Sequence, residues 1–337
     1  MFSMKTLSSA TRASKALSFA PRMTTSFVPR RTFSASQCAK KDIHLPTHEV
    51  LEEHARGISK DLSREASALE KEVVSQLPTT MKNLSLGGKI ALITGGARGL
   101  GYNMAQGLAE AGIKGIAILD FQEALGMVSA EKLKADTGVA TKFIRVDVRD
   151  AAGVADAVAA AHDHFGKLDV VINAAGIADS NLPAETYPDE KFRNLVNINL
   201  NGTFFVCREV GKRMIEARQP GSIINIASMS GSIVNYPQQQ SCYNASKAGV
   251  IQLTKSLAAE WAKYNVRVNS ISPGYMDTEL NRDPKLESQK VIWKERTPMG
   301  RLGDVTELNT LAVFLASDGS SFMTGSDLII DGGYTLW

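Results

Sequence analysis

The stretch "KIALITGGARGLG", Lys89–Gly101, decides the fold of this chain. It begins with a short apolar run, turns through a glycine-rich segment and leads into a helix predicted from about Leu100. Gly95, Gly99 and Gly101 let the backbone turn tightly and approach a pyrophosphate, to which the N-terminus of the helix offers N–H donors and positive potential. The glycine spacing, G-x-x-x-G-x-G, is a weak signal alone, and its position directly after the first predicted strand makes the turn a candidate dinucleotide site.

The same alternation of strand and helix continues toward the C-terminus. Further apolar runs are "GIAIL", "TKFIRVDV", "LDVVIN", "GSIINIAS", "VRVNSIS" and "DLIID", and helices are expected between them, including 122–137 and 151–165. Runs of β-branched residues without polar alternation are typical of strands buried on both faces. We therefore predict an α/β fold of Rossmann type, a doubly wound parallel sheet in a single domain over residues 84–337. Ligands of such sheets bind beyond the carboxyl ends of the strands.

Charge separates the N-terminus from the rest of the 337-residue chain. The formal net charge is +3, but residues 1–40 contain seven Lys or Arg and no Asp or Glu, so the remainder carries −4. The basic excess therefore gives no reason to expect nucleic-acid binding by the folded body. With 44% hydrophobic residues and no apolar run of 18 or more, the composition is that of a globular chain without a membrane span.

Residues 1–40 have the Ser-, Ala- and Arg-rich, acid-free composition of a mitochondrial presequence. The end of this segment, "RRTFSASQCAK", resembles the two-step processing pattern, with Arg31 two residues before Phe33 and removal near Lys40. We expect a mitochondrial matrix enzyme, and a cytoplasmic protein with a basic tail is the alternative.

Residues 41–83 are charged, with apolar residues at roughly helical spacing, and predict a short helical extension that ends in a linker at "PTTMKN". His44, His48 and His54 in this extension lack cysteine partners, so we predict no metal site. The three cysteines of the chain follow no disulfide or metal spacing, which favours reduced thiols.

An acidic residue at the end of the second predicted strand addresses the choice of cofactor. Asp120 follows the glycines by about 20 residues, where a carboxylate accepts hydrogen bonds from the adenosine ribose and repels a 2′-phosphate, so it favours NAD over NADP. Arg98 argues the other way, because a cation in the glycine-rich turn can bind that phosphate. We weight Asp120 more heavily, since Arg98 can instead pair with Asp120 or face solvent. Asp147 closes the third strand before Val148 and suits the adenine amine or, equally, the start of the next helix.

The helix that contains "YNASK" carries the candidate chemistry. Tyr243 and Lys247 are four residues apart and therefore share a helix face. An ordinary tyrosine, with a pKa of about 10, is a poor acid or base at neutral pH. A neighbouring ammonium favours the phenolate and lowers that pKa, so the pair can exchange a proton with a carbinol oxygen while a hydride moves to or from a nicotinamide.

Taken together, these motifs resemble the short-chain dehydrogenase/reductase family. "TGGARGLG", "NAAG", "NINLNGTF", "IINIAS", "YNASK" and "SPGYMDT" follow one another in that family's order over residues 84–337. The resemblance implies a catalytic set of Asn199, Ser228, Tyr243 and Lys247, with the asparagine holding a water that connects the lysine to solvent. It also implies that the nicotinamide carboxamide lies near Pro273, Gly274 and Thr278. The expected cofactor-binding residues are Gly95, Arg98, Gly99, Leu100, Gly101, Asp120, Asp147, Val148, Asn173, Ala174, Gly176, Tyr243, Lys247, Pro273, Gly274 and Thr278.

Two points of this resemblance depend on register. "NAAG" keeps Asn173 and Gly176 where the family usually has two asparagines, which leaves the second amide in doubt. For the serine, the spacing to Tyr243 favours Ser230, whereas the end of the strand "IINIAS" favours Ser228. We prefer Ser228, because the position in the strand fixes where a side chain points while loop length varies.

The loop "NYPQQQ" and the ending "DGGYTLW" resemble most closely the fungal polyol and ketose enzymes of that family. This implies an NAD-dependent dehydrogenase for a sugar alcohol, best D-arabinitol, with Ser230, Asn235 and Gln240 as substrate contacts. The alternatives are a 3-oxoacyl-thioester reductase of mitochondrial fatty-acid synthesis, an NADP(H)-linked mannitol or L-xylulose type of reductase, and a scaffold without activity. The resemblance also implies a homotetramer or homodimer, paired through long helices at 189–217 and 242–264.

Overall fold

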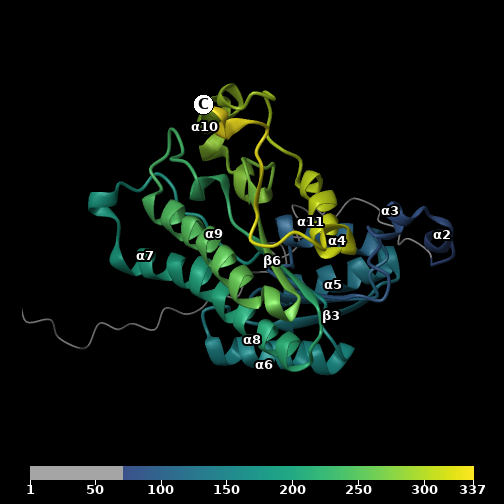
Figure 1. Cartoon of the computed structure of the whole chain (residues 1–337). Helices are drawn as coiled ribbons and strands as arrows, with labels where there is room; N and C mark the ends of the chain where they lie inside the picture. The colour runs from purple at the N-terminus through teal and green to yellow at the C-terminus, as the bar shows by residue number, and fades with distance from the viewer. Residues whose placement is uncertain (1–70) are drawn as a thin grey trace, which may run out of the picture. The chain divides into compact units, whose positions relative to one another are not determined.

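The computed structural model describes residues 71–337, drawn in colour in Figure 1. The expected presequence, 1–40, and most of the expected helical extension, 41–83, lie outside the described residues. Two short helices precede the sheet, α2 (Lys71–Gln76) and α3 (Thr79–Lys82). The second of them occupies "PTTMKN", so a single helical turn lies where the sequence predicted a linker.

Seven parallel strands form one sheet in the order β3-β2-β1-β4-β5-β6-β7. The strands are β1 (Ile90–Thr94), β2 (Gly115–Asp120), β3 (Ala140–Arg145), β4 (Val170–Asn173), β5 (Gly221–Ile226), β6 (Val266–Pro273) and β7 (Asp327–Ile330). From β1, the next two strands are added on one side of the sheet, and from β4 onward the strands are added on the other side. The order therefore reverses between β1 and β4, and a crevice opens at the carboxyl ends of these two strands.

The register of the central strands brings their carboxyl ends to one edge. Thr94 of β1 is level with Leu119 of β2 and Asn173 of β4, and Asn173 is level with Asn225 of β5. Loops that follow these four strands therefore meet over the same crevice.

Strand burial follows position in the sheet. All residues of β1 and β4 are buried, as the unbroken apolar runs predicted. The edge strands β3 and β7 are only half-buried, because each has a neighbour on one side alone. β3 ends at Arg145, three residues before the end of the run "TKFIRVDV", so Asp147 lies in the loop beyond the strand.

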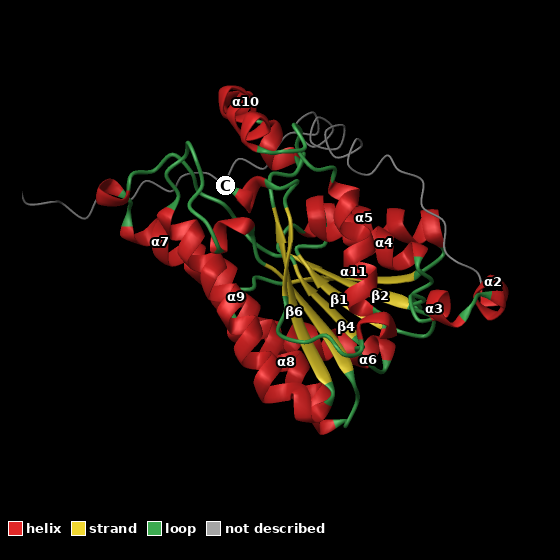
Figure 2. Ribbon diagram, turned by 45° about the horizontal axis from the view of Figure 1, so that its top comes forward, coloured by secondary structure: helices red, strands yellow, loops and turns green. Residues whose placement is uncertain are grey.

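Helices cover both faces of the sheet, as Figure 2 shows. The helices are α4 (Gly99–Glu110), α5 (Glu123–Thr137), α6 (Ala151–Phe165), α7 (Asp189–Val196), α8 (Thr203–Glu216), α9 (Ser241–Trp261), α10 (Glu287–Arg296) and α11 (Asn309–Ala316). One hydrophobic core lies between the sheet and α4, α5 and α11, and a second lies between the sheet and α6, α8 and α9. The predicted doubly wound α/β fold is thereby confirmed.

The long helix expected over 189–217 is present but is not regular. A π-helical segment, η2 (Asn197–Gly202), joins α7 to α8 and contains Asn199. Such a segment carries one extra residue in its turn and commonly marks a functional site. The other expected long helix is α9, which ends at Trp261 and continues as a 3-10 turn to Tyr264.

Within residues 71–337, no helix is long and apolar enough to cross a membrane. Cys207 and Cys242 are buried free thiols, and burial raises the pKa of both.

Candidate active site

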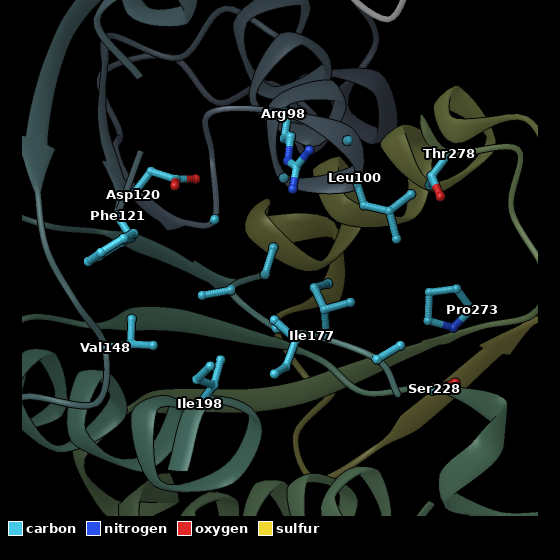
Figure 3. Close-up of a pocket in the computed structure, with 18 of the residues that line it drawn as sticks. Arg98, Leu100, Asp120, Phe121, Val148, Ile177, Ile198, Ser228, Pro273 and Thr278 are labelled. Atoms are coloured by element: carbon cyan, nitrogen blue, oxygen red, sulfur yellow. The ribbon is translucent and has the colours of Figure 1, made fainter. Parts of the chain in front are cut away.

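A cleft of about 670 Å³ lies at the carboxyl ends of the strands, and Figure 3 shows it from close by. Loops after β1, β2, β3, β4, β5 and β6 all contribute to its wall. The sequence-predicted residues that line it are Gly95, Arg98, Gly99, Leu100, Gly101, Asp120, Asp147, Val148, Ala174, Gly176, Ser228, Tyr243, Lys247, Pro273, Gly274 and Thr278. The cleft therefore joins the candidate nucleotide residues to the candidate catalytic residues in one space.

The glycine-rich turn is shaped by contacts of the main chain. Gly95 has φ +64°, and a Cβ there would lie 2.7 Å from the backbone nitrogen of Ala175. A Cβ on Gly101 would lie 2.3 Å from the carbonyl oxygen of Gly95. Gly99 also has a positive φ, +57°, but has open space around it. The turn thus approaches the loop after β4 as closely as backbone can.

Helix α4 begins at this turn without a side-chain cap. Its N-cap residue is Arg98, in extended conformation, and no side chain accepts from the first N–H groups. These N–H groups and the positive end of the helix face the cleft, where an anion such as a pyrophosphate is stabilised. The glycine contacts, the uncapped helix and the size of the cleft fit a dinucleotide.

Asp120 stands at the end of β2 beside the glycine-rich turn (Figure 3). One carboxylate oxygen accepts from the backbone N–H of Ala97 at 3.2 Å, and the other accepts from that of Gln122 at 3.0 Å. Two N–H donors hold the carboxylate in place on the cleft wall. A negative charge fixed there suits ribose hydroxyls and opposes a phosphate.

Arg98 turns away from Asp120. Its Nη1 lies 3.3 Å from Oε2 of Glu279, a residue of the segment after β6, and both side chains are partly exposed. This partner differs from Asp120 and solvent, the two that the sequence suggested for this arginine. Glu279 also lines the cleft, so the ion pair joins the two sides of its mouth.

Beyond β3, Asp147 is engaged by a neighbour that the sequence analysis missed. The guanidinium of Arg149 donates to both carboxylate oxygens of Asp147, with Nη2 at 2.6 Å and Nε at 2.9 Å. This contact lowers the pKa of Asp147. Arg149 also donates to Asn194 at 2.8 Å, so this end of the cleft has a charged and partly exposed wall.

Asn173 does not line the cleft. Its side chain is buried within the sheet and donates to Oδ1 of Asn225 at 2.9 Å and to the sulfur of Cys207 at 3.2 Å. Successive side chains of a strand point to opposite faces, and this one points into the core. The sequence motif located the turn after β4, but its asparagine supports the sheet and its alanines face the cleft.

Tyr243 and Lys247 lie one turn apart near the start of α9. The Nζ of Lys247 lies 5.7 Å from the centroid of the Tyr243 ring and donates to the carbonyl oxygen of Ile226 at 2.8 Å. Lys247 is only 6% exposed, and burial lowers its pKa from 10.5 to about 8. Burial raises the pKa of Tyr243, and hydrogen bonding with Ser228 acts in the opposite direction. In the protein alone burial outweighs the tuning that the sequence suggested, because the ammonium is turned toward Ile226.

Ser228 and Ser230 differ in their position relative to the cleft. Ser228 follows β5 by two residues and lines the cleft (Figure 3), whereas Ser230 is buried in the 3-10 turn behind it. The two hydroxyl oxygens are 3.1 Å apart, and the backbone N–H of Ser230 donates to Oγ of Ser228 at 3.2 Å.

Asn199 is buried behind Gly176 and does not line the cleft. Its Oδ1 accepts from the N–H of Ile177 at 2.9 Å, and its Nδ2 donates to the Ile177 carbonyl at 2.9 Å and to Ser246 at 3.1 Å. A Cβ on Gly176 would lie 3.3 Å from Oδ1 of Asn199 and 3.6 Å from Nζ of Lys247. The asparagine and the lysine thus flank the same point of the backbone.

Three of the four amides of "NYPQQQ" face the protein interior, and that of Gln239 is exposed. Asn235, Gln238 and Gln240 are all at least nine-tenths buried, and none of them lines the cleft. Gln240 donates a hydrogen bond to Oδ1 of Asn235. Asn235 and Gln238 both donate to the hydroxyl of Tyr275, at 3.0 and 2.7 Å. The sequence predicted that Asn235 and Gln240 contact substrate, but the structure holds them one layer behind the cleft.

Several cleft residues were not predicted from the sequence, namely Leu119, Phe121, Gln122, Val146, Arg149, Ala175, Ile177, Ala178, Ile198, Ile226, Ala227, Met276, Glu279 and Asn281. Most of them directly adjoin a predicted residue. The end of a strand therefore located the cleft wall better than the identity of any single residue did. Among the described residues, no group of three or more His, Cys, Asp or Glu side chains is arranged to hold a metal ion.

Comparison with known proteins agrees with this arrangement. Residues 95–335 match the family described as Enoyl-(Acyl carrier protein) reductase. The chain is 39% identical to D-arabinitol 2-dehydrogenase (ribulose-forming) of Scheffersomyces stipitis over 271 residues, which are 76% of this chain and 96% of that protein. It is 40% identical to the NADP-dependent mannitol dehydrogenase of Hypocrea jecorina, over 74% of this chain and 94% of that protein.

Among solved structures, a gluconate 5-dehydrogenase from Burkholderia cenocepacia, in complex with NADP and tartrate, superposes with a TM-score of 0.71 at 36% identity. The match covers 76% of this chain and 99% of that chain.

Proposed function

This chain belongs to the short-chain dehydrogenase/reductase family, and we propose that it oxidises a sugar alcohol to its ketose with NAD, D-arabinitol to D-ribulose or D-xylulose being the reaction we favour. Its relatives are oxidoreductases that act on alcohol and polyol substrates. The observation that carries the proposal is a single cleft lined by Asp120 at one end and by Ser228, Tyr243 and Lys247 at the other.

Tyr243 is the acid–base group of the proposed reaction. When bound, NAD supplies the acceptor for the hydride that leaves the carbinol carbon. The Tyr243 phenolate takes the proton of the carbinol oxygen, and the Ser228 hydroxyl donates a hydrogen bond to that same oxygen. In the reverse direction Tyr243 returns the proton to the ketone oxygen.

Lys247 is the group that favours ionisation of the Tyr243 hydroxyl. Its pKa of about 8 leaves it protonated at neutral pH, and a cation 5.7 Å from the ring centroid favours the phenolate over the phenol. Asn199, on the other side of Gly176, is assigned to the route by which the proton passes from Lys247 to solvent.

The choice of NAD rests on two charges at the mouth of the cleft. Asp120 is held by two backbone N–H groups at the position where a 2′-phosphate would be repelled. Arg98, the cation that suits such a phosphate, pairs with Glu279 instead. Since some relatives are named as NADP-dependent, the cofactor must be tested alongside the substrate.

The test is a panel of sugar alcohols and 3-oxoacyl thioesters, assayed with NAD(H) and with NADP(H) under the same conditions. We expect oxidation of D-arabinitol or a related polyol with NAD, and a weaker preference for NAD in Asp120→Ser. Activity on 3-oxoacyl thioesters alone would instead show a 3-oxoacyl-thioester reductase, the alternative that the sequence left open. A strong preference of the unmodified protein for NADP(H) would overturn the assignment of Asp120.

A further inference from the structure

A buried cluster of polar side chains lies directly behind Ser228 and is not used by the proposed mechanism. We call it the amide cluster, and its members are Ser230, Asn235, Gln238, Gln240, Asn244, Tyr275 and Trp293. It joins the loop before α9 to the segment after β6 and to α10. None of its members lines the cleft, and its hydrogen-bonded link to a cleft side chain is the contact of Ser230 with Ser228.

One end of the amide cluster is fixed by a group that can only donate. The indole N–H of Trp293 donates to Oε1 of Gln238 at 3.1 Å. Gln238 therefore turns its NH₂ group to the hydroxyl of Tyr275, at 2.7 Å. Stacking of the Tyr275 and Trp293 rings, with centroids 4.1 Å apart and planes 5° from parallel, holds this end rigid.

The other end is fixed by the carbonyl oxygen of Ile233, which can only accept a hydrogen bond. Asn244 donates to the carbonyl oxygen of Ile233 at 3.4 Å, so its own oxygen faces Gln240. The NH₂ group of Gln240 donates to this oxygen at 2.9 Å and to Oδ1 of Asn235 at 2.8 Å. Two acceptors thus orient the Gln240 amide, and its NH₂ group also faces Oγ of Ser230 at 3.2 Å.

This orientation determines where the serine protons go. Ser230 has one proton and faces the NH₂ group of Gln240, which has no free acceptor, so that proton cannot go to Gln240 and remains available for Oγ of Ser228 at 3.1 Å. Each hydroxyl can donate and accept, so the bond between the two serines can run in either direction. When Ser228 accepts from the Ser230 hydroxyl and from the Ser230 backbone N–H, its own proton is left for an oxygen in the cleft.

We propose that Gln240 is a positioning residue that acts through Ser230 to direct the hydroxyl proton of Ser228 into the cleft. The inference rests on the proposed function, in which that proton stabilises the carbinol or carbonyl oxygen of the substrate. It assigns to the Gln240 amide a role in proton direction rather than in contact with substrate. A carboxylate at this position would accept from Ser230 and draw the Ser228 proton away from the cleft.

The test compares Gln240→Glu, Gln240→Met and Ser230→Ala with the unmodified protein. The matched control is Gln239→Met, because Gln239 is the adjacent residue of the same type and its side chain is exposed. We expect kcat to fall about tenfold in both Gln240 variants, with little change in the KM for NAD, and to stay unchanged in Gln239→Met. Binding of NADH, followed by its fluorescence, shows that each variant is folded.

The pH profile of kcat for Gln240→Glu distinguishes a role in directing the serine protons from a purely structural role. At low pH the introduced carboxyl is protonated and can donate to Ser230, so the ratio of its kcat to that of the unmodified protein should rise as pH falls. A ratio that does not change with pH would overturn the proposal. If Gln240→Met does not fold, this profile and the Ser230→Ala variant still decide the question.

Whether Gln240 acts through Ser230 is tested by combining the two substitutions. If Gln240 acts only through Ser230, the double variant Ser230→Ala/Gln240→Met should have the kcat of Ser230→Ala. Losses that multiply would show that Gln240 acts by another route. A Ser228→Ala variant of full kcat would instead contradict the proposed function, whereas a loss there with no effect of Gln240→Met contradicts the positioning role alone.

Discussion

The two ends of the cleft are held in place by different parts of the polypeptide. At the nucleotide end, the main chain does most of the positioning, through Gly95 and Gly101 packed on backbone and through N–H groups that hold Asp120. The charged side chains there, such as Arg98, are partly exposed. At the chemical end, Lys247 and the amide cluster are buried and held by side-chain hydrogen bonds.

This difference shows how each end tolerates change. A backbone contact depends on φ and on the space for a Cβ, so a single methyl group can disturb the nucleotide end. A buried side-chain network depends on which atom donates and which accepts, so a substitution of equal size can disturb the chemical end. Substitutions of each kind test whether the distinction holds.

The largest effect is expected from Tyr243→Phe, which removes one hydroxyl from the chemical end. Loss of a general acid–base group typically lowers kcat by ~10²- to 10⁴-fold, and the ring remains to fill its place. Steady-state kinetics should therefore show a large fall in kcat with a similar KM for NAD. Tyr264→Phe, near the end of the same helical segment and 40% exposed, is the control. Comparable activity of the two variants would remove Tyr243 from the mechanism.

A second effect concerns the pH dependence of stability. Lys247 has a pKa of about 8 in the folded protein and an ordinary value of 10.5, so the folded state releases its proton first as pH rises. Stability relative to Lys247→Met should be lowest below pH 8, where the buried charge is fully present, and should rise by ~3 kcal/mol toward pH 10.5.

Urea unfolding of both proteins at the two ends of this pH range gives the difference directly. Both proteins carry Tyr243→Phe in this comparison, because Lys247 lies beside Tyr243, and the remaining titrating groups then cancel. A constant difference across the range would mean that Lys247 is not desolvated as the structure shows.

The smallest effect compares two glycines of one turn. Both Gly95 and Gly99 have positive φ, which costs an alanine about 1–2 kcal/mol. Only at Gly95 would the Cβ also meet backbone, at 2.7 Å from Ala175. Gly95→Ala should therefore be less stable than Gly99→Ala by about 2 kcal/mol, measured by chemical unfolding. Equal losses would show that φ alone matters and that the turn can move away from the loop after β4.

The nucleotide end was the more predictable from sequence. Its residues follow the ends of strands, and the strands could be recognised from unbroken apolar runs. The positions of Asp120 and the glycines therefore followed from the ends of the first two runs. The same reasoning placed Ser228 rather than Ser230 at the cleft, because the strand fixes the direction of the next side chains.

Side chains whose direction depends on a loop or on strand parity were not predictable in this way. Asn173 is in the expected motif, but its position in β4 points it into the core. Asn235 and Gln240 are in a loop whose path is set by contacts with Tyr275 and Asn244, so spacing gave no indication that they face inward. The partner of Arg98, Glu279, lies 181 residues away in the chain and has no local signal.

The π-helical segment Asn197–Gly202 has a consequence for how this chain can change in length. An ordinary helix could be restored by deleting a single residue there, with no loss of hydrophobic pattern in α7 or α8. Such a deletion would leave α7 and α8 nearly in phase, because a π-helical segment absorbs its extra residue within one widened turn, but it would close the turn that contains Asn199. Asn199 would then leave the carbonyl and N–H of Ile177, which it now bonds together. The extra residue therefore sets the direction of the Asn199 side chain, while α7 and α8 keep their own packing.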